Sequence, residues 1–291
     1  MEFALLRCCV TAASLKQYEN ATNAVLRKLG VDLAEIKEFN CCGYPLKNVN
    51  FNASALLSAR NLALAEKENL NITTLCNCCY GSVTHVDHLM KEDASFRKEM
   101  NGELEKEGLK YDGSIKVKHL LEILYDDIGI KRIKEQLVKP FSGLRIAAHY
   151  GCHLIRPDKM VRFENISAAS IFDQLVEVLG AESIDWPKQL ECCGSPLWGI
   201  NDDLSMDLTQ RKIMDAIQSD ADYLCVACPF CQLQFDRVQN TFLSKRNEMR
   251  PLPSILYPQL LGLGLGIDGE SLGIYDNELD ISGIMNFSPE A

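Results

Sequence analysis

Short apolar runs alternate along the chain with longer segments whose apolar residues recur every three or four positions. Short runs bounded by turn residues are typical of buried strands, and the longer spacing is typical of amphipathic helices. In the first half, apolar residues follow the helical spacing after Ser14, a suitable N-cap, until Gly30. The elements predicted here are strands 3–7, 31–39 and 72–75, with helices 14–30 and 53–68 between them.

The second half repeats this order. It has predicted strands at 144–149 and 223–226, a short run at 184–186, and helices at 169–180 and 204–218. Alternating strands and helices predict a parallel sheet with right-handed crossovers in each half. The predicted fold class is therefore α/β, with two pseudo-symmetric repeats that each contain a small parallel sheet flanked by helices.

The segment between the two halves is rich in charged residues, and the C-terminal segment contains a glycine-rich stretch. A charged helix is predicted at 91–110, and a further helix at 116–138 leads to Pro140. The glycine-rich stretch 262–266 lacks the strand–loop–helix context of a phosphate loop and is predicted to be part of an irregular C-terminal wrap. The expected organisation is a first domain at 1–140, a second at 141–260 and a tail at 261–291.

A duplicated cysteine motif defines the chemistry. Cys41-Cys42-Gly-Tyr-Pro-Leu returns 151 positions later as Cys192-Cys193-Gly-Ser-Pro-Leu, and each copy has a cysteine upstream and a Cys-x-x-Cys downstream. Each cysteine group follows a predicted strand, and ligands in parallel sheets bind beyond the carboxyl ends of the strands. The predicted ligand sets are Cys9, Cys41, Cys42, Cys76 and Cys79, and Cys152, Cys192, Cys193, Cys228 and Cys231.

The totals restrict the function classes. With 291 residues and 47% hydrophobic residues, the chain can build two cores without disulfides. A net charge of −10 without a basic run argues against nucleic-acid binding. We identify no signal peptide and no apolar stretch long enough to span a membrane. Thirteen cysteines in such a chain indicate a reducing, cytoplasmic location and metal or redox chemistry.

Thiolates are soft ligands that suit both iron–sulfur clusters and zinc. Five cysteines exceed the four of a structural zinc site, and a vicinal pair suits adjacent irons better than a single ion. The cysteine run of bacterial ferredoxins is missing from the sequence. Cys8, Cys78 and Cys225 are interpreted as free thiols, although Cys78 lies inside the first Cys-x-x-Cys and could replace a neighbour as ligand.

At these residues the chain resembles the CCG-domain family, and within it the B subunits of heterodisulfide reductases from methanogenic archaea. The segment Tyr150-Gly-Cys152-His153-Leu-Ile-Arg156-Pro is also similar to those subunits. The resemblance implies two noncubane [4Fe-4S] clusters, one per repeat. It implies reduction of the mixed disulfide of coenzyme M and coenzyme B to the two thiols.

The resemblance also implies partners. These are the iron–sulfur C subunit of heterodisulfide reductase and its A subunit, which bears flavin and iron–sulfur clusters, together with a hydrogenase or formate dehydrogenase. Two alternatives remain open at this point. The chain could be an electron-transfer component of another complex of the same family, or one of its two sites could hold a structural zinc.

The implied substrate carries a sulfonate and a phosphate, so its cavity needs cations. The candidate substrate-binding residues are Lys47, Arg60, Arg156 and Arg211, each of which could instead be a solvent-exposed charge. His153 follows a predicted ligand and is the candidate catalytic residue, as proton donor to a departing thiolate. The competing interpretation of His153 is a hydrogen-bond donor to cluster sulfur.

Overall fold

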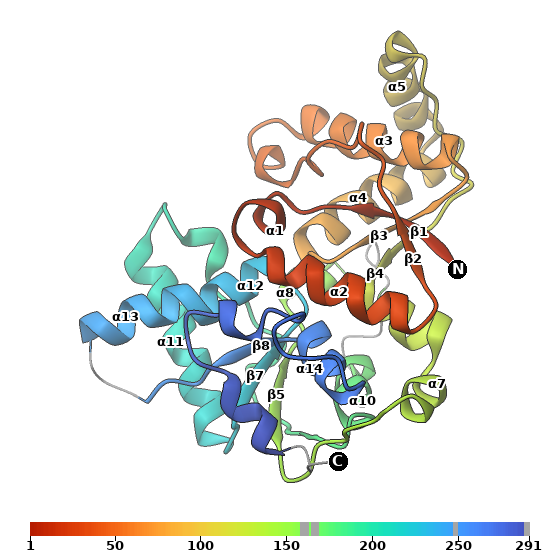
Figure 1. Cartoon of the computed structure of the whole chain (residues 1–291). Helices are drawn as coiled ribbons and strands as arrows, with labels where there is room; N and C mark the ends of the chain where they lie inside the picture. The colour runs from red at the N-terminus through yellow and green to blue at the C-terminus, as the bar shows by residue number, and fades with distance from the viewer. Residues whose placement is uncertain (158–162, 164–168, 247–249, 288–291) are drawn as a thin grey trace.

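The computed structural model describes residues 1–157, 163, 169–246 and 250–287, and it contains two similar α/β halves (Figure 1). Each half is built on a four-stranded parallel sheet. The strand order is β2-β1-β3-β4 in the first half and β6-β5-β7-β8 in the second, so the two sheets have equivalent topology. The predicted α/β class with two parallel-sheet repeats is confirmed.

The first half alternates strands and helices until its sheet is complete. Its strands are β1 (Glu2–Leu6), β2 (Asp32–Ala34), β3 (Asn71–Thr74) and β4 (Val117–His119). Its helices are α1 (Cys9–Ser14), α2 (Lys16–Lys28), α3 (Phe51–Lys67), α4 (Asn77–Glu92), α5 (Ala94–Leu104), α6 (Leu120–Glu122) and α7 (Ile130–Glu135), with a π-helical turn η3 (Ile123–Ile128). Helix α5 projects from the body of the molecule (Figure 1).

The second half follows the same plan and continues into the C-terminal segment. Its strands are β5 (Arg145–His149), β6 (Glu182–Ser183), β7 (Tyr223–Val226) and β8 (Ser254–Leu256). Its helices are α8 (Cys152–Ile155), α10 (Ile171–Glu177), α11 (Asp202–Gln218), α12 (Pro229–Leu233), α13 (Gln239–Arg246) and α14 (Tyr257–Gly264), with a π-helical turn η6 (Gln234–Val238).

Some predicted elements differ from the structure at their ends. The run predicted as a strand at 31–39 pairs with β1 only over Asp32–Ala34, after which the backbone turns toward the first vicinal cysteines. Ser14 ends α1 and does not cap the next helix, because α2 begins after Leu15 without a side-chain cap. The segment 116–138 begins with strand β4, which pairs with β3 before the helical part starts.

The C-terminal segment is more regular than predicted. Residues 257–264 form α14, a buried helix that crosses the expected boundary at 260 and includes the first two glycines of the glycine-rich stretch. Gly262 has no room for a side chain, because a Cβ atom there would lie 2.4 Å from a methyl group of Leu272. The last four residues of the expected tail lie outside the described part of the chain.

The two halves pack together extensively. Helix α14 lies against α2 of the first half, and α4 lies against α8. Asn77 at the start of α4 donates a hydrogen bond of 2.8 Å to the carbonyl of Tyr150 in the second half. Arg237 donates across the same junction to the carbonyl of Ser14 at 2.8 Å. This packing brings the carboxyl ends of β3 and β7 close to each other.

Glu122 gives the fold a testable pH dependence. Burial raises the pKa of its carboxyl to about 7, although hydrogen bonds from the His119 amide and Tyr80 lower it. The folded state therefore holds a proton that the unfolded chain releases at an ordinary carboxyl pKa, so stability falls as the pH rises from about 4.5 through 7. At pH 8 we expect the free energy of unfolding of Glu122→Gln, measured by urea denaturation, to exceed that of wild type by about 3 kcal/mol. At pH 5 the two proteins should have similar free energies of unfolding.

The matched control for this measurement is Glu135→Gln, which changes an exposed carboxyl on α7. The control should leave the pH profile unchanged. A Glu122→Gln protein that keeps the wild-type pH dependence would contradict the assignment.

Candidate metal centre

Each of the two vicinal cysteine pairs is followed by a tight turn that begins at glycine. Gly43 has φ +85° and Gly194 has φ +97°, in the left-handed region that favours glycine. A Cβ atom would lie 2.4 Å from the carbonyl oxygen of Ser54 at Gly43, and 2.7 Å from that of Ser205 at Gly194. The turn therefore needs glycine both for its backbone conformation and for its close approach to the next helix.

Hydroxyl groups on that helix hold each turn in place. In the first half, Ser54 donates to the carbonyl of Gly43 at 2.8 Å, and Ser58 donates to the carbonyl of Cys42 at 2.6 Å. Helix α3 thus anchors the backbone of the turn at two successive carbonyls. These bonds engage only the backbone and leave the sulfur atoms of Cys41 and Cys42 available as ligands.

The second half repeats this clamp. Ser205 donates to the carbonyl of Gly194 at 3.0 Å, and Thr209 donates to that of Cys193 at 3.0 Å. Both residues lie 151 positions after their counterparts, as do the cysteines themselves. The repeat therefore includes the supporting helix as well as the candidate ligands.

The Cys-x-x-Cys pairs lie at helix N-termini. Cys76 caps α4 and Cys228 caps α12, and the second cysteine of each pair lies in the first turn of the helix. The positive end of the helix dipole favours a thiolate over a thiol, and the thiolate is the form that binds metal.

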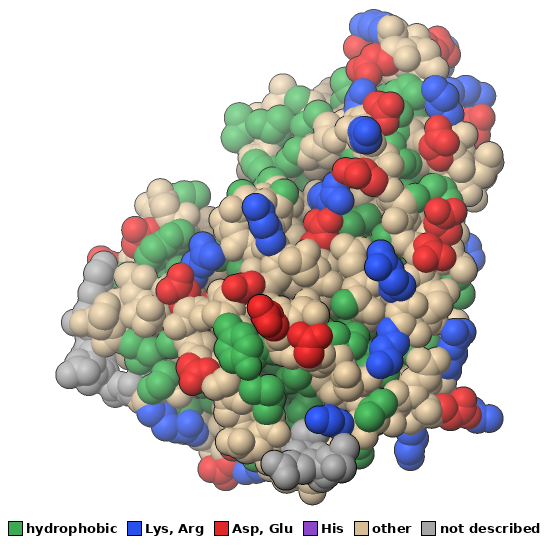
Figure 2. Space-filling model, viewed as in Figure 1, with side chains coloured by type: hydrophobic (Ala, Val, Ile, Leu, Met, Phe, Trp, Pro, Cys, Tyr) green, Lys and Arg blue, Asp and Glu red, His purple; other side chains and the backbone are tan. Residues whose placement is uncertain are grey.

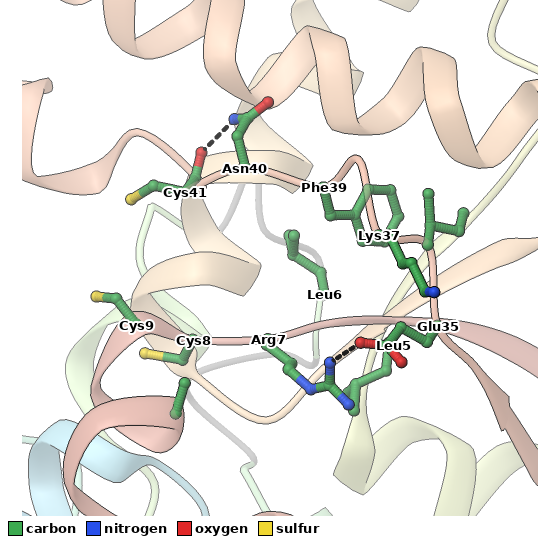
Figure 3. A pocket seen from close by; sticks show the side chains of 12 residues that line it. Leu5, Leu6, Arg7, Cys8, Cys9, Glu35, Lys37, Phe39, Asn40 and Cys41 are labelled. Carbon is green, nitrogen blue, oxygen red and sulfur yellow. Dashed lines mark hydrogen bonds and ion pairs between the residues drawn. The ribbon is translucent and has the colours of Figure 1, made fainter.

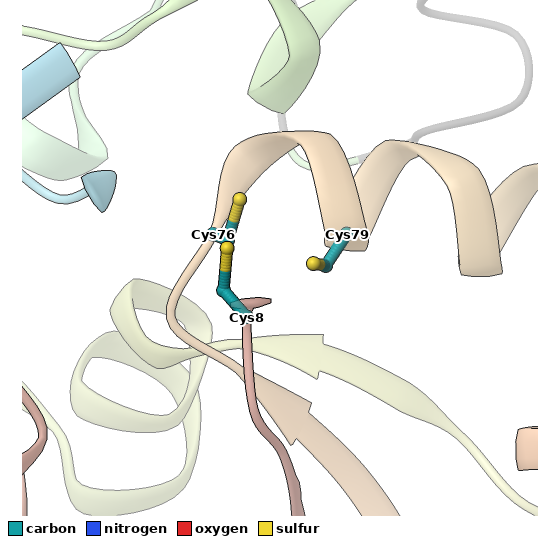
Figure 4. A group of neighbouring side chains, drawn as sticks. All are labelled: Cys8, Cys76 and Cys79. Atoms are coloured by element: carbon teal, nitrogen blue, oxygen red, sulfur yellow. The ribbon is translucent and has the colours of Figure 1, made fainter. Parts of the chain in front are cut away.

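In the first half, three buried sulfurs come together. The Sγ atoms of Cys8, Cys76 and Cys79 lie within 4.8 Å of one another (Figure 4). Cys8 was interpreted from the sequence as a free thiol, yet the structure brings it, and not Cys9, into this group. Cys9 is exposed and lies beside Cys41 at the rim.

A cavity of about 240 Å³ opens at Cys9 and Cys41. The sulfurs of these residues and of Cys8 lie toward one end of it, and the cationic groups of Arg7 and Lys37 lie toward the other (Figure 3). Arg7 is paired with Glu35 and, at 2.8 Å, with Glu19. The sequence analysis did not select Arg7 or Lys37, although the position of Arg7 directly before Cys8-Cys9 was an available signal.

The remaining thiols of the first half connect these two groups. Cys42 interacts with both Cys41 and Cys79, and hydrogen bonds from these two thiols lower its pKa to about 4. Cys9, Cys41, Cys42 and Cys79 line a second, smaller cavity together with Cys8 and Cys78. We call Cys9, Cys41, Cys42, Cys76 and Cys79, with Cys8 beside them, the first cysteine site.

The second cysteine site consists of Cys152, Cys192, Cys193, Cys228 and Cys231. Its thiols form a similar chain of contacts, in which Cys152 and Cys193 donate hydrogen bonds to Cys192 and lower its pKa to about 2. A ring nitrogen of His149 joins this site, because it lies within 4.8 Å of the sulfurs of Cys193 and Cys231. The sequence analysis missed His149, which is the last residue of β5.

The two cysteine sites meet at the junction of the halves. Cys76 and Cys228, the equivalent helix caps, lie close enough for their thiols to hydrogen bond, and each alters the pKa of the other. A cavity of about 40 Å³ is lined here by Cys78 of the first half and by Cys152, Cys193, Cys228 and Cys231 of the second. Tyr44 and Phe230 also line it.

His153 lies at this junction, between thiols of both halves. Its Nδ1 atom is 3.6 Å from the sulfur of Cys78 and 3.5 Å from that of Cys152. Burial lowers the pKa of His153, but the hydrogen bond and charge of Cys78 outweigh this effect, so the pKa is raised overall. The structure therefore gives His153 both access to the cavity and a tendency to hold a proton.

The other predicted cations are placed differently. Arg60 bonds to the carbonyl of Glu38 at 2.6 Å and to Glu107 at 2.7 Å, so it supports the chain that leads to Cys41. Arg156 likewise bonds to the carbonyl of Leu190, at 2.7 Å, before the second vicinal pair. Arg211 is exposed on α11.

Lys47 is the predicted cation whose charge acts on His153 at the junction. Its charge acts on His153 and on His85, where in each case it favours the neutral ring and so works to lower the pKa. Of the four predicted cations, Lys47 is thus the one whose charge acts on a residue that lines the junction cavity.

The donor set fits metal clusters. All thirteen cysteines are free thiols, and ten of them gather into two sites that follow strand ends. Among the described residues, neither ring nitrogen of the buried His149 beside the second site has a hydrogen bond of ordinary geometry, which is expected where a polar group of a cofactor satisfies it. These are sites that can bind metal clusters.

Comparison with known proteins identifies the family. The model of the cysteine-rich domain, CCG, matches residues 3–84 and 146–236, which together exceed half of the chain. The chain belongs to the CCG family. Each matched region contains one Cys-Cys-Gly motif followed by a Cys-x-x-Cys, so the two family domains coincide with the two cysteine sites.

Full-length relatives are oxidoreductase subunits. The chain is 34% identical to the B subunit of the ferredoxin/F420H2-dependent CoB-CoM heterodisulfide reductase of Methanosarcina acetivorans, over 96% of this chain and 94% of that protein. It is 32% identical to the 8-methylmenaquinol:fumarate reductase membrane anchor subunit of Wolinella succinogenes, over 96% and 97% of the two chains. Across the described residues of this chain, we find no helix with the length and hydrophobicity needed to cross a membrane.

A solved structure shares the fold. A hypothetical protein from Helicobacter pylori superposes with a TM-score of 0.79 at 16% identity, over 97% of this chain. This chain spans about half of that protein, 52% of its length. At such low identity the likeness concerns the fold alone.

The glycine of the vicinal turn can be tested directly. We expect Gly43→Ala to lower the free energy of unfolding by more than about 2 kcal/mol, because a positive φ costs roughly 1–2 kcal/mol and the Cβ atom also meets the Ser54 carbonyl. Chemical denaturation under anaerobic conditions measures the loss.

Gly108→Ala is the control, since Gly108 has φ +69° but open space around the new Cβ atom. It should cost only the conformational term of about 1 kcal/mol. Equal losses in the two variants would show that the contact with α3 does not constrain the turn.

Proposed function

We propose that this chain is the catalytic component of a heterodisulfide reductase, which reduces the mixed disulfide of coenzyme M and coenzyme B to two thiols. The observation that carries the proposal is the contact of two duplicated cysteine sites, at Cys76 and Cys228, beside a cavity at the junction of the halves. A disulfide has two sulfur atoms and needs two electrons. A pair of equivalent centres in contact beside one cavity matches both requirements.

Each site would hold one noncubane [4Fe-4S] cluster, which supplies one electron at a time when bound. Cys9, Cys41, Cys42, Cys76 and Cys79 would bind the first cluster, with Cys8 as an alternative to Cys9. Cys152, Cys192, Cys193, Cys228 and Cys231 would bind the second. A structural zinc at one site fits less well, because both halves present more than four sulfur donors.

The protein groups around the cavity would position the substrate and move its proton. Tyr44 and Phe230 provide apolar walls, and Lys47 attracts an anionic end of the disulfide. His153, placed 3.5 and 3.6 Å from two thiol sulfurs, would deliver a proton to the departing thiolate. In this proposal Arg60 and Arg156 support the loops before the vicinal cysteines, and Arg211 is an exposed charge on α11.

The electrons would come from partner proteins, as the names of the full-length relatives suggest. We propose that these partners are an iron–sulfur C subunit and a flavin-bearing A subunit, supplied in turn by a hydrogenase or formate dehydrogenase. The thirteen free cysteines favour the reducing cytoplasm as the location.

Exposed apolar side chains support binding to a partner. Val49 is 84% exposed and Ile200, 151 positions later, is 81% exposed. Both follow the vicinal cysteine turns, and Figure 2 shows hydrophobic side chains gathered over the segments before α3 and α11, on either side of a notch. Such patches are typical of protein interfaces, and this one lies next to the cysteine sites.

A second candidate function is electron transfer by clusters that do not bind a disulfide. The relationship to a subunit of 8-methylmenaquinol:fumarate reductase favours it. The two functions differ in whether a metal ion in the cavity binds an external thiol. That difference can be measured on the purified chain.

The test combines metal analysis with thiol binding. We expect about eight irons per chain after anaerobic purification, because each cluster contains four. Oxidation in the presence of coenzyme M should produce a new EPR signal, and the chain with a reduced electron donor should reduce the mixed disulfide. Eight irons without a thiol-dependent signal would support the electron-transfer function instead.

Cysteine variants make this test specific. Cys42→Ala and Cys193→Ala should each lose about half of the iron, since each removes a ligand from one cluster. Cys225→Ala is the control, because Cys225 is buried on β7 and should leave the iron content unchanged. Full loss of iron in Cys225→Ala would contradict the ligand sets.

His153→Gln tests the proton donor. We expect the turnover rate to fall about 100-fold, the lower end of the range for loss of a general acid, with the iron content unchanged. Adding the thiol-dependent EPR measurement separates a loss of proton delivery from a loss of substrate binding. His88→Gln on α4 serves as the control and should keep full activity, and an equal loss in both variants would remove His153 from the mechanism.

A further inference from the structure

The two cysteine sites differ in the residues that lie behind them. The strand register makes Leu6 and His149 equivalent, since Leu6 pairs with Thr74 and His149 with Val226 at the last position of each sheet. On the supporting helix, Asn61 corresponds to Lys212, 151 positions later. An apolar and a neutral side chain in the first half are therefore replaced by a histidine and a lysine in the second.

His149 is buried against the second cysteine site. Its side chain is 1% exposed, and it packs edge-on against Phe235 and beside Trp186. Neither ring nitrogen has a hydrogen bond of ordinary geometry among the described residues, although the backbone of Gln189 approaches the ring. Because one ring nitrogen lies within 4.8 Å of the sulfurs of Cys193 and Cys231, the ring faces the space between the ligands.

Lys212 is also buried, at 1% exposure, which is rare for a lysine. Its ammonium group donates to the carbonyl of Lys188 and lies 4.7 Å from the centre of the Trp186 ring. It has no carboxylate within ion-pair distance among the residues that the structure describes. The charges that act most on it are those of Cys193 and Cys231.

In the first half the comparable cation is Arg60, which donates to the carbonyl of Glu38 but is paired with Glu107 at 2.7 Å. Asn61 accepts a hydrogen bond of 2.9 Å from the amide of Asn40 and donates one of 3.1 Å to its carbonyl. Arg7, which lies on the other side of the first cysteine site, is paired with Glu19 and Glu35. The charge of Arg7 is therefore largely balanced, whereas that of Lys212 has no carboxylate partner among the described residues and lies over Trp186, which packs beside His149.

A positive charge and hydrogen-bond donors near a cluster stabilise its reduced form, which carries one more negative charge. We propose that His149 and Lys212 make the second cysteine site the more readily reduced of the two. An electron that enters the chain then resides first at the second site, and the next electron at the first site. His149 and Lys212 act as positioning residues, and they tune the centre without contacting substrate.

This inference rests on the proposed presence of a cluster in each site, but it does not depend on the identity of the disulfide. The experiment is an anaerobic redox titration of the purified chain with dithionite and mediators, followed by EPR. Dithionite supplies one electron to each centre and is itself oxidised. Two successive one-electron steps are expected, and the step at higher potential should be missing in Cys193→Ala and retained in Cys42→Ala.

Lys212→Met and Lys212→Arg form the decisive pair. Lys212→Met removes the charge but keeps the length of the side chain, and it should lower the reduced-to-oxidised ratio of the second centre at least tenfold at a fixed potential. That ratio corresponds to about 59 mV for one electron. Lys212→Arg keeps the charge and should leave the potential close to wild type.

His149→Leu introduces the residue of the first half and should shift the same step in the same direction. Lys131→Met, which removes an exposed lysine charge on α7, is the control and should not shift it. A higher-potential step that belongs to the first site, or equal potentials in Lys212→Met and wild type, would overturn the inference. A chain that binds no iron at all would instead contradict the proposed function, so the two failures are distinguishable.

Discussion

The vicinal cysteine turn, clamped by two hydroxyl groups on the following helix, is the constraint on which both candidate centres depend. The glycine directly after the two thiols turns the backbone sharply, and that turn brings the chain against the helix. The hydroxyls of Ser54 and Ser58 satisfy the carbonyls that would otherwise be buried without a partner. The same clamp at Ser205 and Thr209 explains why the 151-residue spacing extends beyond the cysteines.

Parallel topology then determines which residues can meet. In each sheet the central pair of strands ends at the same edge, so the cysteines that follow β1 and β3, or β5 and β7, approach one another despite their distance in sequence. The packing of the two halves adds a second level of convergence. Contact between Cys76 and Cys228 joins two sites that each half would otherwise present to solvent.

The duplicated pattern was sufficient to predict the fold class and the grouping of most cysteines, because strand ends and glycine turns are local features of the sequence. The strands β4 and β8 were missed because each has only three residues and is defined by pairing with a neighbour. Cys8 and Cys9 could not be distinguished from sequence, since adjacent residues after a strand point in different directions. Spacing gave no indication that Cys8 would be the one that faces Cys76. The polar groups behind the second site, His149 and Lys212, were also beyond sequence reasoning, because only their burial distinguishes them from an ordinary strand end and an ordinary helix charge.

Duplication followed by divergence offers a physical reason for such asymmetry. Two identical centres would have equal affinity for an electron, and nothing would direct the first electron to one side of the shared cavity. Retaining the clamp while replacing Leu6 and Asn61 by a histidine and a buried lysine keeps the geometry of ligation and changes its electrostatics. Burying the charge of Lys212 destabilises the fold relative to an apolar residue, which would pack there without desolvating a charge. The proposed electrostatic role of Lys212 at the second site explains why a lysine occupies this position.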